Sequence, residues 1–290
     1  VLLFWVLNMK NYIVNKDTIL INYLIEELKY SHKEAKKKLA NNQILVNNKK
    51  ITQYNYNLKC NDSITINNFN SKINDNIEII EEDKNIIVVN KPSNLLTVST
   101  NKEKEKTLYH LVSEYLKKNN KNSKVFVIHR LDRETSGIVM FAKSTKIQSI
   151  YQNNWDSLVK YRGYQAIVEG IPKKSSDTII QYLKETDNLY VFATKNNTGK
   201  KAITCYKVTK SNQNYSLLDI EIKTGRKNQI RIAMQSIGNS IVGDKKYGDK
   251  NFKTNYFCLH ANKLVIIDPN SKKILTFEIN IPTYFNNFVH

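Results

Sequence analysis

The chain has 290 residues, of which 45 are Lys or Arg and 26 are Asp or Glu, so its formal net charge is +19. A charge this far from zero predicts a polyanionic partner, which is either a nucleic acid or an anionic membrane surface. The three cysteines, Cys60, Cys205 and Cys258, are odd in number and lack metal-ligand spacing. This usage disfavours a disulfide framework and a metal site, and it predicts reduced thiols in a cytoplasmic protein.

The first residues of the chain resemble neither a membrane span nor a secretory signal. The apolar segment Val1–Leu7 is far shorter than the roughly 20 residues that cross a bilayer. It also lacks a basic leader and a small-residue cleavage site. Met9 is the expected initiator, and residues 1–9 are interpreted as an upstream extension. These features favour a nucleic acid over a membrane as the partner.

Residues 10–68 predict a small domain of two helices followed by a hairpin. Asp17 is the expected cap of the first helix, whose apolar residues recur at helical spacing. Ser31 and Glu34 form a capping box for the second helix. The Asn47-Asn48 pair, between two apolar segments, predicts the hairpin turn. The second helix is basic and carries Lys33, Lys36, Lys37 and Lys38.

A polar, irregular stretch at 69–76 predicts a linker to a second domain that spans residues 77–290. An apolar face predicts a helix around residues 108–116, and another helix is expected to open near Arg226. The expected strands of this domain cover residues 77–80, 86–89, 125–128, 138–142, 164–168, 202–208 and 217–222. Strands interleaved with few helices predict an α+β fold with a mixed, largely antiparallel central sheet.

The charged run from His129 to Gly137 is the most informative segment of the chain. It places one carboxylate, Asp132, between Arg130 and Arg133, and it connects two apolar segments that are typical of buried strands. Loops held in this way are where catalytic residues usually lie. A surface turn with an ion pair is the alternative interpretation.

The use of arginine supports the catalytic interpretation. The only arginines are Arg130, Arg133, Arg162, Arg226 and Arg231. Because lysine supplies most of the positive charge, arginine is expected where a planar fork of donors is required. Such places include bidentate contacts with phosphate, carboxylate or base edges.

Taken together, four motifs resemble those of the RluA-type pseudouridine synthase family. They are His-Arg-Leu-Asp-x-x-Thr-Ser-Gly at 129–137, Arg-Gly-Tyr-Gln-Ala-Ile-Val-Glu-Gly at 162–170, Thr-Gly-Arg-Lys-Asn-Gln-Ile-Arg at 224–231 and Val-Gly-Asp-x-x-Tyr-Gly at 242–248. Their order and approximate spacing match the family, and the likeness spans roughly residues 77–285. The helix-helix-hairpin pattern resembles the S-four-like RNA-binding module that precedes the catalytic domain in many members.

The resemblance implies an enzyme that isomerises uridine to pseudouridine in RNA without a cofactor or metal. It assigns Asp132 as the nucleophile at the anomeric carbon, through either a covalent adduct or an elimination. Asp132 must then be ionised, and Arg231 is the expected ion-pair partner. Tyr164 would stack on the flipped uracil and take part in proton removal. Arg130 would fill the space that the nucleotide leaves.

The remaining expectations concern RNA binding and the identity of the substrate. We expect a monomer that binds RNA through Arg130, Arg133, Arg162, Arg226, Lys36 and Lys37. Large-subunit ribosomal RNA is the favoured target because family members that act on it often carry the N-terminal module. Transfer RNA is the main alternative. A non-enzymatic RNA-binding protein is less favoured, and a glycoside hydrolase would need a second carboxylate in the motifs.

Several positions depart from the family pattern. Asn94 stands where glycine is usual, Asn228 replaces a typical histidine, and Asn239-Ser240 replaces a common His-Pro pair. None removes a proposed catalytic group. His129, at the end of an apolar strand, is expected to be a hydrogen-bonded packing residue and not a base.

Overall fold

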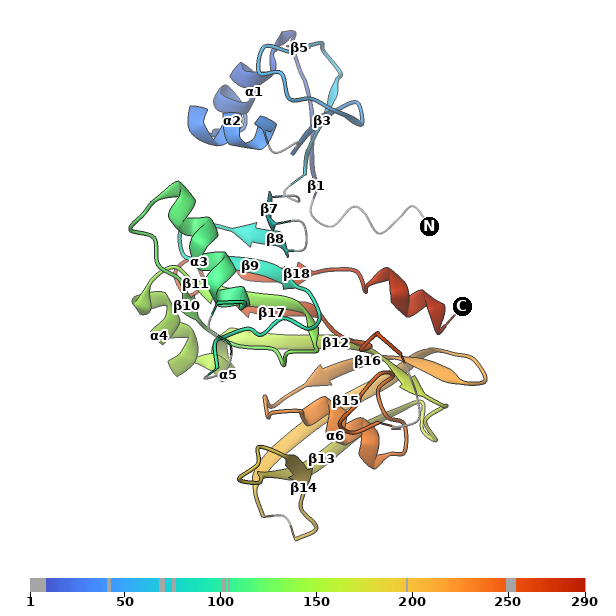
Figure 1. The fold of residues 1–290 in the computed structure, drawn as a ribbon. Helices are drawn as coiled ribbons and strands as arrows, with labels where there is room; N and C mark the ends of the chain where they lie inside the picture. Colours follow the sequence, from blue (N-terminus) through green and yellow to red (C-terminus); the bar gives the residue numbers. More distant parts are fainter. Residues whose placement is uncertain are drawn as a thin grey trace. The chain divides into compact units, whose positions relative to one another are not determined.

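The computed structural model describes residues 9–40, 43–67, 71–74, 77–100, 103, 105–196, 198–248 and 254–289. Contacts between backbone positions divide the chain into two units, Val1–Glu82 and Asp83–His290. Both are drawn in Figure 1. Most of the expected upstream extension, residues 1–8, lies outside the described residues. None of the helices among the described residues is long and apolar enough to cross a bilayer.

The first unit contains two helices and short strands. Its elements are β1 (Met9–Ile13), β2 (Thr18–Ile19), α1 (Leu20–Glu26), α2 (His32–Ala40), β3 (Ile44–Val46), β4 (Lys49–Lys50), β5 (Asn57–Leu58), β6 (Ser63–Asn67), β7 (Ser71–Asn74) and β8 (Ile77–Glu82). One sheet has the order β1-β6-β3-β4, and β2 pairs with β5. Leu20 and Leu24 of α1, Leu39 of α2 and Ile64 of β6 share one buried core. Burying each of these side chains contributes about 1.5–3 kcal/mol.

Local sequence signals account for most of this unit. The capping box of α2 is present, because the backbone N–H of Ser31 donates to Glu34 Oε2 at 2.9 Å and that of Glu34 donates to Ser31 Oγ at 3.3 Å. Asn47 and Asn48 have φ values of 49° and 66° and join β3 to β4. Positive φ at both central residues is the requirement of a two-residue type I′ hairpin turn.

Two expectations for this unit differ from the structure. Asp17 does not cap α1, because β2 lies between them; its carboxylate instead accepts from the backbone N–H of Cys60 at 2.8 Å and from Lys59 Nζ at 2.9 Å. Part of the expected linker at 69–76 is β7, which pairs with β8 in an antiparallel ladder. Its polar composition did not reveal that its backbone groups would be satisfied by a neighbouring strand.

The second unit is built on one long twisted sheet. Its strands are β9 (Ile86–Lys91), β10 (Phe126–Val127), β11 (Ser136–Ala142), β12 (Val159–Glu169), β13 (Ser176–Glu185), β14 (Val191–Ala193), β15 (Lys200–Ser211), β16 (Tyr215–Ile222), β17 (Leu259–Ile267) and β18 (Ile274–Glu278). The order is β14-β13-β15-β16-β12-β17-β11-β9, with β10 beside β11 and β18 beside β17. Of the strand pairs whose register is described in this unit, β11 with β17 is parallel and the others are antiparallel. The expected α+β class with a mixed, largely antiparallel sheet is therefore confirmed.

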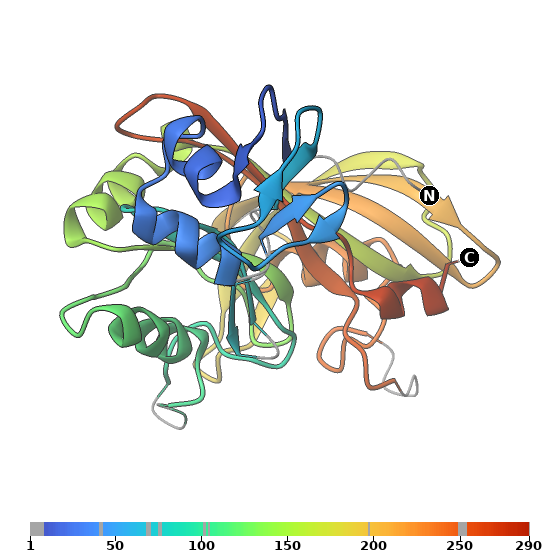
Figure 2. The same ribbon diagram turned by 90° about the horizontal axis from the view of Figure 1, so that it is seen from above.

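The helices of the second unit are α3 (Leu108–Asn119), α4 (Thr145–Asn153), α5 (Trp155–Leu158) and α6 (Gln229–Ser236), with a 3₁₀ helix at Thr283–Asn287. Both views place α3 and α4, in green, toward one end of this unit and the β15–β16 hairpin, in orange, toward the other (Figures 1 and 2). Ile230, Ala233 and Met234 of α6 pack on Ala166 of β12 and Leu218 of β16. This packing fixes the helix whose first turn carries Arg231, the last residue of the motif at 224–231.

Gly137 allows the loop that carries Asp132 to enter β11 beside β17. Its φ is +117°, and an added Cβ would lie 2.2 Å from the carbonyl oxygen of Ala261, its parallel partner in β17. A residue with a side chain would therefore face both an unfavourable backbone conformation and a backbone clash.

We expect Gly137→Ala to lower the stability of the second unit by at least about 3 kcal/mol, because strain and overpacking add. Gly238→Ala is the matched control: its φ is +81°, but nothing lies within 4 Å of the added Cβ. The control should lower the free energy of unfolding by only about 1–2 kcal/mol, because it has the unfavourable backbone conformation without the clash. Urea unfolding of both variants measures the difference, and equal losses of stability would show that the close approach to Ala261 does not constrain the loop.

Candidate active site

Asp132 lies in the loop between β10 and β11, at the border of two cavities of the second unit. The first, of about 990 Å³, is also lined by Tyr164 and is called the Tyr164 cavity. The second, of about 700 Å³, is also lined by Lys246 and is called the Lys246 cavity. Lys227, Asn228 and Arg231 line both cavities together with Asp132. Asp132 thus belongs to the lining of both cavities.

The structure gathers most of the expected site residues around Asp132. The Tyr164 cavity is lined by Arg130, Asp132, Arg162, Tyr164, Arg226 and Arg231. Arg133 lines the Lys246 cavity. Lys36 lies on α2 of the first unit, exposed, with its ammonium 6.0 Å from the ring centre of Tyr54. Lys37 belongs to the same helix, but its side chain is outside the described residues.

The carboxylate of Asp132 has an unusual electrostatic environment. Burial raises its pKa above the ordinary value, while the positive charges of Arg231 and Arg130 act in the opposite direction. Within the described part of the chain, no group donates a hydrogen bond to this carboxylate or forms an ion pair with it. Its charge is therefore influenced by neighbouring arginines that do not bond to it.

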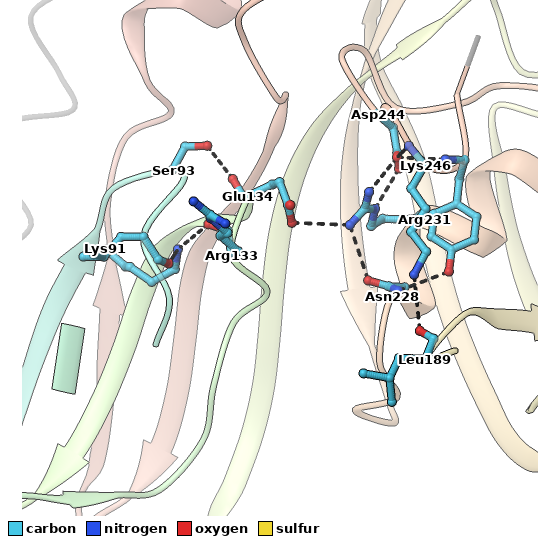
Figure 3. A network of polar contacts seen from close by, with 11 residues as sticks. Lys91, Ser93, Arg133, Glu134, Leu189, Asn228, Arg231, Asp244 and Lys246 are labelled. Atoms are coloured by element: carbon cyan, nitrogen blue, oxygen red, sulfur yellow. Dashed lines mark hydrogen bonds and ion pairs between the residues drawn. The ribbon is translucent and has the colours of Figure 1, made fainter. Parts of the chain in front are cut away.

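Arg231 does not form the expected ion pair with Asp132. Its Nε donates to Asp244 Oδ2 at 2.8 Å and its Nη2 donates to Asp244 Oδ1 at 2.6 Å, and the two side chains are only 6% and 1% exposed (Figure 3). Its Nη1 faces Glu134 Oε2 at 3.5 Å. The fork of donors matches the two oxygens of Asp244 in a bidentate pair. Arg231 nevertheless remains close enough to lower the pKa of Asp132.

Further contacts hold the guanidinium of Arg231 in place. It lies over the rings of Tyr247 and Phe257, at 5.2 and 5.0 Å from their centres. Asn228 has a left-handed backbone with φ 55°. Its Nδ2 donates to Tyr247 Oη at 3.1 Å, and its Oδ1 accepts from Arg231 Nη1 at 3.4 Å. The residue that departs from the family pattern at this position therefore supports the arginine.

Tyr164 projects from β12 into its cavity with its phenol group protonated. Burial raises its pKa to about 12, and the negative charge of Asp132 adds to this while Arg162 opposes it. At neutral pH the ring is thus a neutral surface with a hydroxyl donor, which suits stacking against a base.

Lys91 anchors the loop that carries Asp132. Its side chain is fully buried, and its ammonium donates to the carbonyl oxygens of Pro92, Leu95 and Arg133 at 3.0, 2.7 and 3.0 Å. Burial lowers its pKa to about 7, although Glu134 and Asp132 act against that shift. The ammonium ties the loop after β9 to the loop that carries Asp132, as Figure 3 shows for Arg133.

His129 is a packing residue, as expected from its position. Its Nε2 accepts from the backbone N–H of Met140 at 3.1 Å, and its ring lies 5.7 Å from that of Trp155. Burial, together with the charge of Arg162, lowers its pKa to about 4 and keeps it neutral. Asn94 has φ 63°, the left-handed conformation that asparagine tolerates in place of glycine. No three His, Cys, Asp or Glu side chains in the described ranges form a metal-ligand group.

Comparison with known proteins identifies the family. A family model described as RNA pseudouridylate synthase matches residues 85–236. The chain is 30% identical to an uncharacterized RNA pseudouridine synthase of Bacillus subtilis over 212 residues, which covers 72% of this chain and 70% of that protein. It is 34% identical over 222 residues to the ribosomal large subunit pseudouridine synthase C of Rickettsia bellii, which covers 72% and 69%. The chain belongs to the RNA pseudouridylate synthase family.

Solved structures agree at the level of the fold. Human RNA pseudouridylate synthase domain containing 4 superimposes with a TM-score of 0.60 at 22% identity, over 72% of this chain and 90% of that one. Human RNA pseudouridylate synthase domain containing 1 gives a TM-score of 0.58 at 20% identity, over 74% and 86%. The chain is therefore an RNA pseudouridine synthase in family and in fold, as its motifs indicated.

Asp244 is the site residue whose importance the sequence did not reveal. Besides Arg231, its Oδ1 accepts from the backbone N–H groups of Lys246 and Tyr247, both at 2.9 Å. The sequence signal for this residue was the Gly243-Asp244 pair within the family motif at 242–248, but the motif does not indicate which side chain Asp244 binds. One carboxylate thus orders both the turn at 244–248 and the arginine beside Asp132.

We expect Asp244→Asn to lower the stability of the synthase by about 3 kcal/mol, because it leaves a buried arginine without its counter-charge. It should also slow the reaction, since Arg231 would no longer be held near Asp132. Asp177→Asn is the matched control, because Asp177 pairs with an exposed lysine, Lys174, at 2.8 Å. That change should leave the urea midpoint nearly unchanged; equal shifts in the two variants would contradict a structural role for the Arg231–Asp244 pair.

Proposed function

We propose that this synthase isomerises uridine to pseudouridine in large-subunit ribosomal RNA, with Asp132 as the nucleophile. The observation that carries the proposal is the unpaired carboxylate of Asp132 between the Tyr164 and Lys246 cavities. The ribosomal target is supported by similar proteins named ribosomal large subunit pseudouridine synthase C and D, from Rickettsia bellii and Borreliella burgdorferi. A transfer RNA uridine is the alternative target of the same chemistry.

The reaction breaks the bond from ribose to the base nitrogen, turns the freed uracil, and rejoins it through the neighbouring ring carbon. Asp132 acts on the sugar, either by adding to the anomeric carbon or by assisting an elimination. Both routes need the ionised carboxylate, whose pKa is raised by burial and lowered by Arg231 and Arg130. The role of Arg231 is thus to favour the charged form without blocking its oxygens.

The base occupies the Tyr164 cavity in this proposal. The ring of Tyr164 stacks on the uracil, and its hydroxyl group takes part in removing the proton from the ring carbon. Two arginines of this cavity are oriented by hydrogen bonds to backbone carbonyl groups. Arg162 Nη2 donates to the carbonyl oxygen of Lys223 at 2.9 Å, and Arg226 Nε donates to the carbonyl oxygen of Lys201 at 3.0 Å. Their remaining N–H groups can contact the RNA. Arg130 is exposed at the rim, where it can replace the extruded nucleotide in the RNA stack.

The first unit is proposed to bind the RNA as an S-four-like module. Support comes from α2, which begins at a capping box and presents Lys33 and Lys36 as exposed side chains. Exposed Tyr54 lies below Lys36, so an aromatic ring accompanies the positive charge. Lysines and aromatic rings together suit phosphates and unstacked bases.

We expect Asp132→Asn to reduce the single-turnover rate by at least about 10⁴-fold, as removal of a nucleophile does in other enzymes. RNA affinity should change by less than about threefold, because phosphate contacts supply most of it. Asp156→Asn is the matched control, since Asp156 is an exposed aspartate that lines the same cavity. Pseudouridine can be mapped in unmodified large-subunit ribosomal RNA and in transfer RNA. Normal turnover by the Asp132 variant would exclude Asp132 as nucleophile, and product in transfer RNA alone would exclude the ribosomal target.

We also expect the double substitution Lys36→Gln and Lys37→Gln to weaken binding to a structured ribosomal RNA fragment. The logarithm of the binding constant should fall less steeply with the logarithm of salt concentration, by about 0.7–0.9 for each phosphate that the variant no longer neutralises. Lys117→Gln with Lys118→Gln is the control, an adjacent exposed pair in the last turn of α3. If both double variants have the same salt dependence, the RNA-binding assignment of the first unit is wrong.

A further inference from the structure

The turn between β13 and β14 reaches the Lys246 cavity with a strained residue at its tip. The backbone N–H of Leu189 donates to the carbonyl of Thr186 at 2.9 Å, and that of Thr186 donates to the carbonyl of Tyr190 at 2.8 Å. Leu189 has φ 60° and is 63% exposed, although it lines the cavity. A bulky residue is rare in this left-handed region, and strain of this kind gathers at functional sites.

Two lysines converge on the carbonyl oxygen of this strained residue. Lys227 Nζ donates to Leu189 O at 3.3 Å and Lys246 Nζ donates to it at 3.4 Å. These bonds are long, and the acceptor is neutral, whereas an ammonium binds an anionic oxygen at about 2.7–2.9 Å. Lys227 also pairs with Glu185, and Lys246 lies over the rings of Tyr190 and Tyr247. Figure 3 shows Leu189 and Lys246 beside the Arg231 network.

The charges around the Lys246 cavity are not balanced. Its lining has five basic side chains, Arg133, Lys227, Arg231, Lys245 and Lys246, and two acidic ones, Asp132 and Glu134. Adding Asp244 and Glu185, which pair with Arg231 and Lys227, leaves one positive charge in excess. Burial and then repulsion from Arg231 and Lys227 lower the pKa of Lys246. One excess charge is what a single phosphodiester would balance.

The position of Asp132 decides which part of the RNA enters this cavity. If the uracil lies in the Tyr164 cavity and its sugar lies at Asp132, the backbone phosphates of that nucleotide must leave on the other side. The Lys246 cavity shares Asp132 with the Tyr164 cavity, so it adjoins the position assumed for the sugar. Ammonium groups act as point charges that suit a phosphate and do not discriminate between bases.

We propose that Lys227 and Lys246 bind one phosphodiester of the substrate RNA next to the target uridine, and that the Leu189 carbonyl occupies the phosphate's place until the RNA arrives. This inference rests on the proposed function, because it assumes a uridine at Asp132. Binding of the phosphate replaces a weak neutral acceptor with an anionic one. It also frees the turn at 186–190 from the two lysines.

The test combines single neutral linkages in the RNA with substitution of the lysines. An RNA fragment that the wild-type enzyme converts is prepared as a series. Each member of the series carries one neutral methylphosphonate in place of one phosphodiester near the target uridine. Single-turnover rates against enzyme concentration give the half-saturating concentration and the plateau rate. For the wild-type enzyme, a neutral methylphosphonate at one linkage adjacent to the target should raise the half-saturating concentration at least about fivefold. The plateau rate should stay within about twofold of the rate on unmodified RNA.

The double variant Lys227→Gln with Lys246→Gln should have a raised half-saturating concentration on unmodified RNA. The rise should equal the one that the neutral linkage causes for the wild-type enzyme. The variant should show no further rise when that one linkage is neutral, because the ammonium groups that would sense the phosphate charge are already gone. Its salt slope should be shallower by about 0.7. Lys227→Arg with Lys246→Arg keeps both charges and should retain the sensitivity to the linkage. Lys207→Gln with Lys210→Gln, exposed lysines of β15 that line neither cavity, should behave like the wild type.

Two outcomes would overturn the phosphate site. The first is a wild-type enzyme that tolerates every neutral linkage adjacent to the target, a result that does not depend on how the variants fold. The second is a folded Gln variant that stays as sensitive as the wild type at the same linkage. Failure of the proposed function is seen separately, because the wild-type enzyme would then form no pseudouridine in ribosomal or transfer RNA.

Discussion

The pair between Arg231 and Asp244 is the interaction on which the rest of the site depends. Two charges that are 6% and 1% exposed can be held together in the protein interior only when their hydrogen bonds are satisfied, and here both bonds of the bidentate pair are short. Because Asp244 takes the Nε and Nη2 donors, the arginine is fixed in orientation while Asp132 stays free of a direct partner. The role proposed for Asp132 needs this combination of a nearby positive charge and oxygens without a partner.

The position of Asp132 depends on backbone contacts more than on charge. The ammonium of Lys91 holds the carbonyl of Arg133, the residue after Asp132, and Gly137 lets the chain pass close to Ala261 in β17. Ser93 adds a bond from its hydroxyl to the carbonyl of Glu134 at 2.5 Å. The loop is thus fastened at three positions that follow Asp132 in the chain. A group held by rigid neighbours gives up little freedom when substrate binds.

Features with a local cause could be predicted from the sequence, whereas features with a distant partner could not. The capping box at Ser31 and Glu34 and the Asn47-Asn48 turn each depend on residues within a few positions of one another. Asp17 was wrongly expected to cap α1, because its partners, Lys59 and Cys60, lie more than forty positions away. The strands β13, β14, β17 and β18 of the second unit were not predicted. In β13, exposed and half-buried residues alternate along most of the strand, and no long apolar run marks it.

By itself, the sequence determined the α+β class and the family, and it predicted a set of site residues most of which line the cavities around Asp132, because motifs and periodicity are properties of neighbouring residues. It grouped the arginines but assigned Arg231 to the wrong carboxylate. Only the tertiary structure decided that Asp244 holds Arg231, that Lys91 supports the loop of Asp132, and that Lys227 and Lys246 meet at Leu189. These contacts join segments from different strands and loops, and which donor reaches which acceptor depends on the register of the sheet that brings them together.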